Sequence, residues 1–180
     1  MTDLNRQHAA GDLGPEYFYQ ATIHRIPGWQ PGQGLQASAA IDASKLGHPL
    51  EGVFPYQSHE PTIPFTALPT SLKLHGQPVT FFKADVSQLI SNIDAGVPTG
   101  VALRLTREFY SPVGGLIPFS AAVLPAPMIH AVVVVGLGHD SQGDPWFYIR
   151  NSWGASWGQD GHAWIPAAYI NAHAACAFGV

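Results

Sequence analysis

Three side chains in this chain of 180 residues could take part in nucleophilic chemistry. His130 heads the apolar run Ala-Val-Val-Val-Val, and Asn151 opens an Asn-Ser-Trp-Gly sequence after a second apolar run. A histidine that takes and returns a proton, and an asparagine that fixes its tautomer, are two of the three parts of a catalytic triad. A thiol could be the third part, and Cys176 is the only cysteine.

The stretch from His130 to Gly161 resembles the carboxyl-terminal half of papain-like cysteine peptidases. The His at the head of a strand, the Asn-Ser-Trp-Gly turn and the Ser-Trp-Gly that follows carry the resemblance. It implies that His130 is the general base and Asn151 its orienter, and that Trp153 covers the pair against water. Where the family usually has Gly before the His, this chain has Ile129. A bulky side chain there would crowd the primary pocket or change how a substrate lies.

The same resemblance assigns further residues to a substrate cleft. Gln33-Gly34-Leu35 is similar to the family's Asn-Gly-Gly stretch, where glycine lets a peptide substrate pair with the main chain. A glycine at the start of a helix explains Gly34 almost equally well. Trp157 is interpreted as lining the site, although a core aromatic is the alternative. The predicted cleft residues are Gln33, Gly34, Leu35, Ile129, Trp153 and Trp157.

The nucleophile that the resemblance requires is missing from its expected place. In the family the His and Asn follow the Cys by roughly 130 to 150 residues, which points to a position around or before residue 1. Residues 1–37 contain no Cys and no Ser, and no recognisable counterpart of the Gln that helps form the oxyanion hole. Because two catalytic parts are missing together, we expect a chain that is truncated before or at the catalytic Cys and lacks the nucleophile helix. As it stands, it should not hydrolyse peptides.

Cys176 lies in the apolar terminal run Ala-Ala-Cys-Ala-Phe-Gly-Val. Burial disfavours a thiolate and raises the thiol pKa, so we predict a buried core cysteine and not a relocated nucleophile. The nine histidines show no His-x-x-x-His or His-x-x-Glu-His spacing, so no metal is predicted, and no other cofactor is expected.

Composition indicates a globular and rather apolar chain. It is 46% hydrophobic and 11% charged, and its length allows one substantial core. With 8 basic against 12 acidic residues and no basic cluster, neither nucleic acid nor a membrane surface is an expected partner. A single cysteine allows no internal disulfide, unlike secreted animal and plant relatives, which suggests a bacterial type or a reducing compartment. The polar segment Met1 to Asp12 is no signal peptide, so the expected location is cytoplasmic or left open.

The predicted elements make an α+β chain with a papain-like cysteine proteinase fold. Glycine caps and apolar periodicity predict helices over 14–25, 34–46 and 85–95. Strands are predicted over 101–105, 129–137, 146–150, 162–165 and 176–180, with an extended run over 71–83 and a loop over 109–119. By resemblance, residues 1–56 are the remnant of the helical half, and residues 57–180 are an antiparallel, barrel-like sheet half that carries His130 and Asn151.

Two functions of different classes follow. The first is a cysteine-type peptidase that acts on a peptide or protein substrate. The second is a non-catalytic relative that holds a peptide or protein partner. Without its nucleophile helix, the chain would expose apolar surface that a second copy or another partner would cover.

Overall fold

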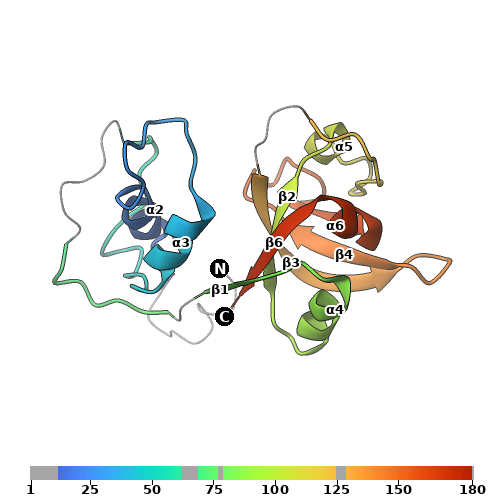
Figure 1. The fold of residues 1–180 in the computed structure, drawn as a ribbon, viewed down its shortest axis with the longest axis horizontal. Helices are drawn as coiled ribbons and strands as arrows, with labels where there is room; N and C mark the ends of the chain where they lie inside the picture. The colour runs from blue at the N-terminus through green and yellow to red at the C-terminus, as the bar shows by residue number, and fades with distance from the viewer. Residues whose placement is uncertain (1–11, 62–68, 77–78, 125–128, 180) are drawn as a thin grey trace. The chain divides into compact units, whose positions relative to one another are not determined.

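The computed structural model describes residues 12–61, 69–76, 79–124 and 129–179. The chain forms two compact units, the first running to Thr80 and the second covering Phe81–Gly179 (Figure 1). Within the described ranges, no helix has both the length and the apolar character needed to cross a membrane.

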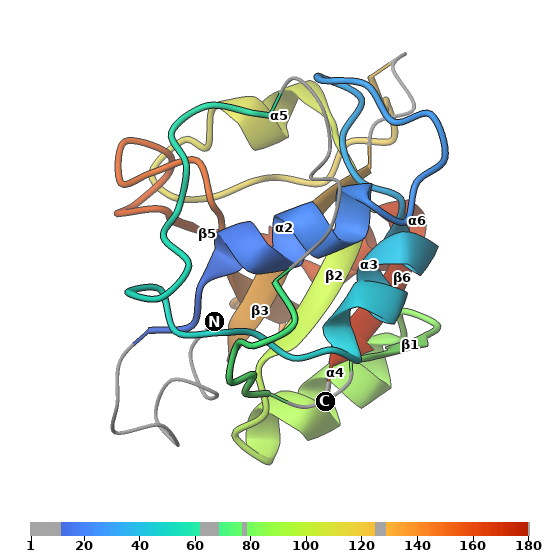
Figure 2. The ribbon, with the colours of Figure 1, turned by 90° about the vertical axis from the view of Figure 1, so that its left-hand side faces the viewer.

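Two helices organise the first unit. They are α2 (Pro15–Ile23) and α3 (Ala37–Ser44), which lie side by side (Figure 2) and match the helices predicted over 14–25 and 34–46. Proline suits the first turn of α2, because its missing N–H has no partner to lose there. Gly47 follows α3 with a φ of 78°, and an added Cβ would lie 2.8 Å from the His75 carbonyl oxygen. Two small clusters fill the space around the helices: Ile23, Ile26, Trp29 and Ala39, and Tyr17, Ala21 and Ala43.

Contacts join the segment before Thr80 to these helices. The compact units divide after Thr80, and the half-domain boundary at 56/57 stays a prediction. The main chains of His48 and His75 pair, and Leu72 and Leu74 pack against the cluster around Tyr17. These contacts join residues far apart in the sequence, so local patterns do not reveal them.

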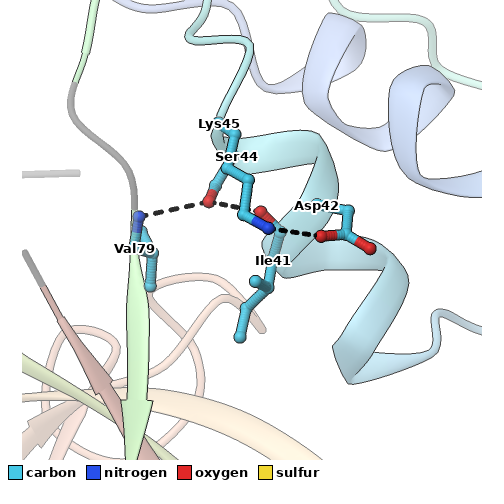
Figure 3. A network of polar contacts seen from close by, with 5 residues as sticks. All are labelled: Ile41, Asp42, Ser44, Lys45 and Val79. Carbon is cyan, nitrogen blue, oxygen red and sulfur yellow. Dashed lines mark hydrogen bonds and ion pairs between the residues drawn. The ribbon is translucent and has the colours of Figure 1, made fainter.

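Ser44, the last residue of α3, adds a polar contact to the same segment. Its Oγ accepts a hydrogen bond from the Val79 amide at 3.1 Å and donates one to the Ile41 carbonyl at 2.7 Å (Figure 3). Beside it on the surface, Lys45 Nζ lies 2.7 Å from a carboxylate oxygen of Asp42. Ser44 therefore connects the end of α3 to the residue before β1.

The second unit is built on a six-stranded sheet with the order β1-β6-β2-β3-β4-β5, and the pairs β6–β2, β2–β3, β3–β4 and β4–β5 are antiparallel. Its strands are β1 (Thr80–Phe82), β2 (Thr99–Arg104), β3 (Ile129–His139), β4 (Pro145–Arg150), β5 (His162–Pro166) and β6 (Ala174–Gly179). The predicted strands are confirmed within a few residues, although Val180 lies outside the described residues. Among the described residues of the extended run predicted over 71–83, only Thr80–Phe82 form a strand. β3 lies inside the sheet, as its run of valines at 132–135 indicates.

Two helices pack on the core side of this sheet. α4 (Val86–Asp94) begins at Asp85, whose carboxylate accepts a hydrogen bond from the Gln88 amide at 3.1 Å. It matches the helix predicted over 85–95. α6 (Ala167–His173) was not predicted, because its seven residues follow a strand directly and no side chain caps its first turn. Leu89 from α4 and Tyr169 and Ile170 from α6 enter one core cluster with the inward side chains of the strands.

Candidate active site

His130 and Asn151 meet at one end of the sheet. His130 is the second residue of β3, and Asn151 follows the last residue of β4. Because these strands are antiparallel neighbours, the start of β3 and the end of β4 lie at the same end of the sheet. His130 Nε2 lies 2.8 Å from Asn151 Oδ1. The two side chains that the sequence singles out are therefore hydrogen-bonded, while their catalytic roles stay a prediction.

The surroundings of Asn151 decide which atom donates in that bond. The Ser152 amide can only donate, and it lies 2.8 Å from Asn151 Oδ1, so this atom is the acceptor oxygen. His130 Nε2 must then carry a proton, which leaves Nδ1 of the neutral ring free to accept one. Asn151 is 8% exposed, and its main-chain amide donates a hydrogen bond to the Gly161 carbonyl at 2.9 Å. Asn151 is thus held through its main-chain amide and its Oδ1, whereas its buried Nδ2 has no hydrogen-bond partner among the described residues.

Aromatic side chains cover the His–Asn pair. The ring of Trp153 lies 4.7 Å from that of His130 at an angle of 38°. Phe109 is fully buried and meets His130 edge-on at 5.9 Å, and Tyr110 packs on Trp153 at 5.1 Å. Excluding water in this way strengthens a hydrogen bond, because the local dielectric constant falls. The contact of Trp153 with His130 is the one that the resemblance implies.

Trp157 and Ile129 occupy different positions around this pair. Trp157 is 6% exposed, and its Nε1 donates to the Phe109 carbonyl at 2.9 Å. Its ring contacts Phe109 at 5.3 Å and Trp153 at 6.1 Å. It therefore supports the site from the core and does not form its surface. Ile129, the residue before His130, is 54% exposed, so its predicted place in a substrate cleft stays a prediction.

The stretch Gln33-Gly34-Leu35 lies in the first unit, immediately before α3. The N-cap of α3 is Gln36, so Gly34 lies outside the helix and its start. Gly34 has a φ of 73°, and an added Cβ would meet no atom within 4 Å. Its left-handed backbone favours glycine, while packing does not require it. Leu35 is 41% exposed, so this stretch presents main chain and an apolar side chain on the surface.

Comparisons with known proteins identify the family. The family described as "Papain family cysteine protease" matches residues 30–177. The chain belongs to the papain family of cysteine proteases. It is 23% identical over 133 residues to fruit bromelain of Ananas comosus, covering 74% of this chain and 36% of bromelain. It is 28% identical over 126 residues to cathepsin B-like CP2 of Giardia intestinalis, covering 66% of this chain and 41% of that protein. The chain thus spans less than half the length of these two curated relatives.

Solved structures of papain-family members share the fold. Procathepsin L 3 from the larval midgut of Tenebrio molitor superposes with a TM-score of 0.71 at 22% identity, over 97% of this chain and 57% of that one. Xylellain, a cysteine protease from Xylella fastidiosa, superposes with a TM-score of 0.67 at 22% identity, over 97% and 71%. The predicted α+β, papain-like fold is confirmed.

Phe109 packs on His130 and Tyr110 packs on Trp153, and no sequence pattern predicts either contact. Phe109 and Tyr110 lie on α5 (Arg107–Tyr110), a single turn that overlaps the loop predicted over 109–119. Four residues show no helical periodicity, and the burial of Phe109 depends on distant partners such as Trp157 and Tyr169. The resemblance from His130 onward does not reach this segment.

Cys176 cannot act as the nucleophile for His130. Cys176 pairs with Ala102, and Ala102 pairs with Ala131 on the strand of His130. Neighbouring residues of a strand point to opposite faces, so the thiol and the imidazole lie on different faces of the sheet, two strands or about 10 Å apart. Burial raises the pKa of the Cys176 thiol, although the side chain is half-buried and not enclosed in the core as predicted. The described residues also contain no group of three or more His, Cys, Asp or Glu side chains that could hold a metal.

Proposed function

We propose that this chain provides the base and its orienter for a papain-type cysteine peptidase centre, and that the thiol comes from outside these 180 residues. The hydrogen bond of 2.8 Å between His130 Nε2 and Asn151 Oδ1 carries the proposal. It leaves Nδ1 as the proton acceptor, and Trp153 covers the bond on one side. The substrate in this proposal is a peptide or protein, the class on which papain-family proteases act.

The chemistry requires repeated proton transfers to and from Nδ1, during both formation and hydrolysis of a thioester. The ring nitrogen first takes the thiol proton, which gives a thiolate and an imidazolium. The thiolate attacks the peptide carbonyl carbon, and the imidazolium returns the proton to the leaving amine as the C–N bond breaks. Nδ1 then takes a proton from water as the water oxygen attacks the thioester carbonyl carbon, and the C–S bond breaks to release the carboxylic acid product and the thiolate. Asn151 holds the ring through all these steps, because its Oδ1 accepts the hydrogen bond from Nε2–H throughout.

In the proposal, the 180-residue chain alone does not hydrolyse peptides. Its one thiol, on Cys176, lies on the other face of the sheet from His130, and its raised pKa disfavours the thiolate. The proposal extends to a bacterial-type protein, supported by the single cysteine, which allows no internal disulfide.

The position of Cys176 on the sheet face away from His130 also favours a second candidate, a papain-fold protein that holds a peptide or protein partner without cleaving it. Ala131 is exposed, and Val133 and Cys176 are half-buried on the sheet face away from the core. A second copy of this chain or a different partner could cover that apolar face.

The gene sequence directly upstream of the Met1 codon separates the candidates. An in-frame Gln followed shortly by Gly-x-Cys supports the peptidase, and the longer product should then cleave a fluorogenic peptide library. Replacing His130 with Ala should lower that rate by about 10²- to 10⁴-fold, because general acid–base catalysis contributes this much. His139→Ala, at the exposed far end of the same strand, is the matched control and should leave the rate unchanged.

Two results would count against the peptidase. One is a longer product whose hydrolysis persists in His130→Ala. The other is an upstream region without these codons, together with peptide binding that leaves the peptide intact, which favours the binding protein.

Alkylation of Cys176 by iodoacetamide in the 180-residue chain should proceed at the same rate in wild type and in His130→Ala. A rate that depends on His130 would instead assign Cys176 a role in the site.

A further inference from the structure

A carboxylate in the first unit fastens the loop that precedes α3. Glu60 Oε2 accepts a hydrogen bond from the Gly32 amide at 2.7 Å. Its other oxygen, Oε1, accepts one from the Tyr19 hydroxyl at 2.5 Å. Because Tyr19 belongs to α2, Glu60 connects the loop over 29–35 to a helix. Hydrogen bonds to an ionised acceptor are about twice as strong as neutral ones, so this is a firm attachment.

A second attachment lies two residues further along the loop. Trp29 is 3% exposed, and its Nε1 donates to the Gly34 carbonyl at 3.1 Å. Its ring also meets that of Tyr19 edge-on at 6.3 Å. Between the two attachments, the Gln33 amide donates to the Gln30 carbonyl at 3.1 Å. The loop is thus held at Gly32 by Glu60 and at Gly34 by Trp29, and Tyr19 contacts both holding groups.

Hydrogen bonds, and not packing, set the shape of this loop. Gly32 and Gly34 have φ values of 80° and 73°, and an added Cβ at either would meet no atom within 4 Å. Glycines are the most flexible residues in an unfolded chain, so ordering them costs more entropy than ordering any other residue. A disulfide cannot hold the loop, because Cys176 is the only cysteine. The conformation of Gln33–Leu35 therefore depends on the two attachments.

We propose that Glu60 is a positioning residue for peptide binding: by fixing Gly32, it presents the main chain of Gln33–Leu35 in one conformation to an extended peptide. Glu60 itself does not contact the peptide. Tyr19 orients the carboxylate, and the exposed Leu35 offers the bound peptide an apolar contact. The inference rests on the proposed function, because it takes the peptide substrate of that function as the molecule that this stretch binds.

The test uses Glu60→Gln in the full 180-residue chain, which keeps the size of the side chain and removes its charge. Glu51→Gln is the matched control, because Glu51 Oε1 also accepts a main-chain amide bond, from Tyr56 at 2.7 Å, elsewhere in the same unit. NMR measures amide exchange at Gly32 and Gly34, and titration measures the affinity for the capped peptide acetyl-Ala-Leu-Gly-Ala-amide. Thermal unfolding and the chemical shifts of His130 and Asn151 report on the rest of the chain.

We expect Glu60→Gln to speed exchange at Gly32 and to weaken peptide binding, each by about threefold to tenfold, as loss of a charge-assisted bond near the surface implies. Thermal unfolding and the His130 shifts should not change, and Glu51→Gln should behave as wild type. If Glu60→Gln unfolds the chain, Tyr19→Phe repeats the test, because it keeps the ring contact with Trp29 and removes only the hydroxyl. Equal peptide affinity in wild type and the variant overturns the positioning role and leaves the proposed function standing. Absence of peptide-induced shifts at Gly34 in wild type also overturns it, while the hydrolysis test above still decides the proposed function.

Discussion

Replacing Trp153 with Ala tests whether this side chain protects the His130–Asn151 hydrogen bond. Trp153 is 37% exposed and packs on His130 and Tyr110. If an enclosed Trp buries about 200 Å², the variant returns about 130 Å² to water, which at about 25 cal/mol per Å² is about 3 kcal/mol of unfolding free energy. Loss of cover should also weaken the neutral His–Asn bond by up to about 1 kcal/mol, or about fivefold in opening.

The assay combines urea unfolding with proton NMR of the His130 Nε2 proton. Trp146→Ala is the matched control, because Trp146 is a half-buried Trp near the other end of β4, where its Nε1 donates to Asp140 at 3.3 Å. We expect both variants to lose stability, and only Trp153→Ala to exchange the Nε2 proton about fivefold faster. Equal exchange in Trp153→Ala and wild type would refute the protective role of Trp153.

Three further predictions concern the fold. Tyr169→Phe removes a hydroxyl that accepts a hydrogen bond from the Thr106 amide at 3.1 Å and donates one to the Arg104 carbonyl at 3.2 Å. Urea unfolding should therefore show that the free energy of unfolding falls by about 1 to 3 kcal/mol. A loss below the error of measurement would contradict this. Gly158→Ala should have a melting temperature well below that of Gly143→Ala, because a Cβ at residue 158 would lie 2.2 Å from the His162 carbonyl oxygen. A Cβ at residue 143 would have no neighbour within 4 Å, so Gly143→Ala is strained only by its left-handed φ of 87°. Similar melting temperatures would show that the loop at Gly158 relaxes. Burial lowers the pKa of His48 from 6.5, against a smaller opposing effect of a backbone hydrogen bond with Gly14. Below pH 6.5 the unfolded chain therefore binds a proton that the folded chain resists, and the free energy of unfolding should fall as the pH falls. His48→Phe should flatten this pH dependence in urea titrations, and an unchanged pH dependence would assign it to another group.

Much of the second unit follows from local sequence patterns. The valines at 132–135 indicate a strand inside the sheet, and β3 lies between β2 and β4. Asp85 and Gly96 delimit α4 as a cap and a left-handed stop. The spacing of the two strand ends that carry His130 and Asn151 is set by the hairpin between them, so their contact follows from the predicted antiparallel pair.

Other features depend on contacts that no local pattern records. Phe109 lies in a single helical turn, and its burial comes from Trp157 and Tyr169, which are far along the chain. The Glu60 carboxylate reaches Gly32 across 28 residues, and neither residue has a motif that announces the bond. Cys176 was predicted to be buried from its apolar neighbours, but strand alternation places it on the half-exposed face of the sheet.

The protonation of the His130 ring tests the central claim most directly. Two-bond ¹H–¹⁵N spectra at a pH where the ring is neutral should show the proton on Nε2 and an unprotonated Nδ1, and Asn151→Ala should change the Nε2 signal because its acceptor is lost. A proton on Nδ1, or an Nε2 signal that does not respond to Asn151→Ala, would contradict the assignment of His130 as a base oriented by Asn151.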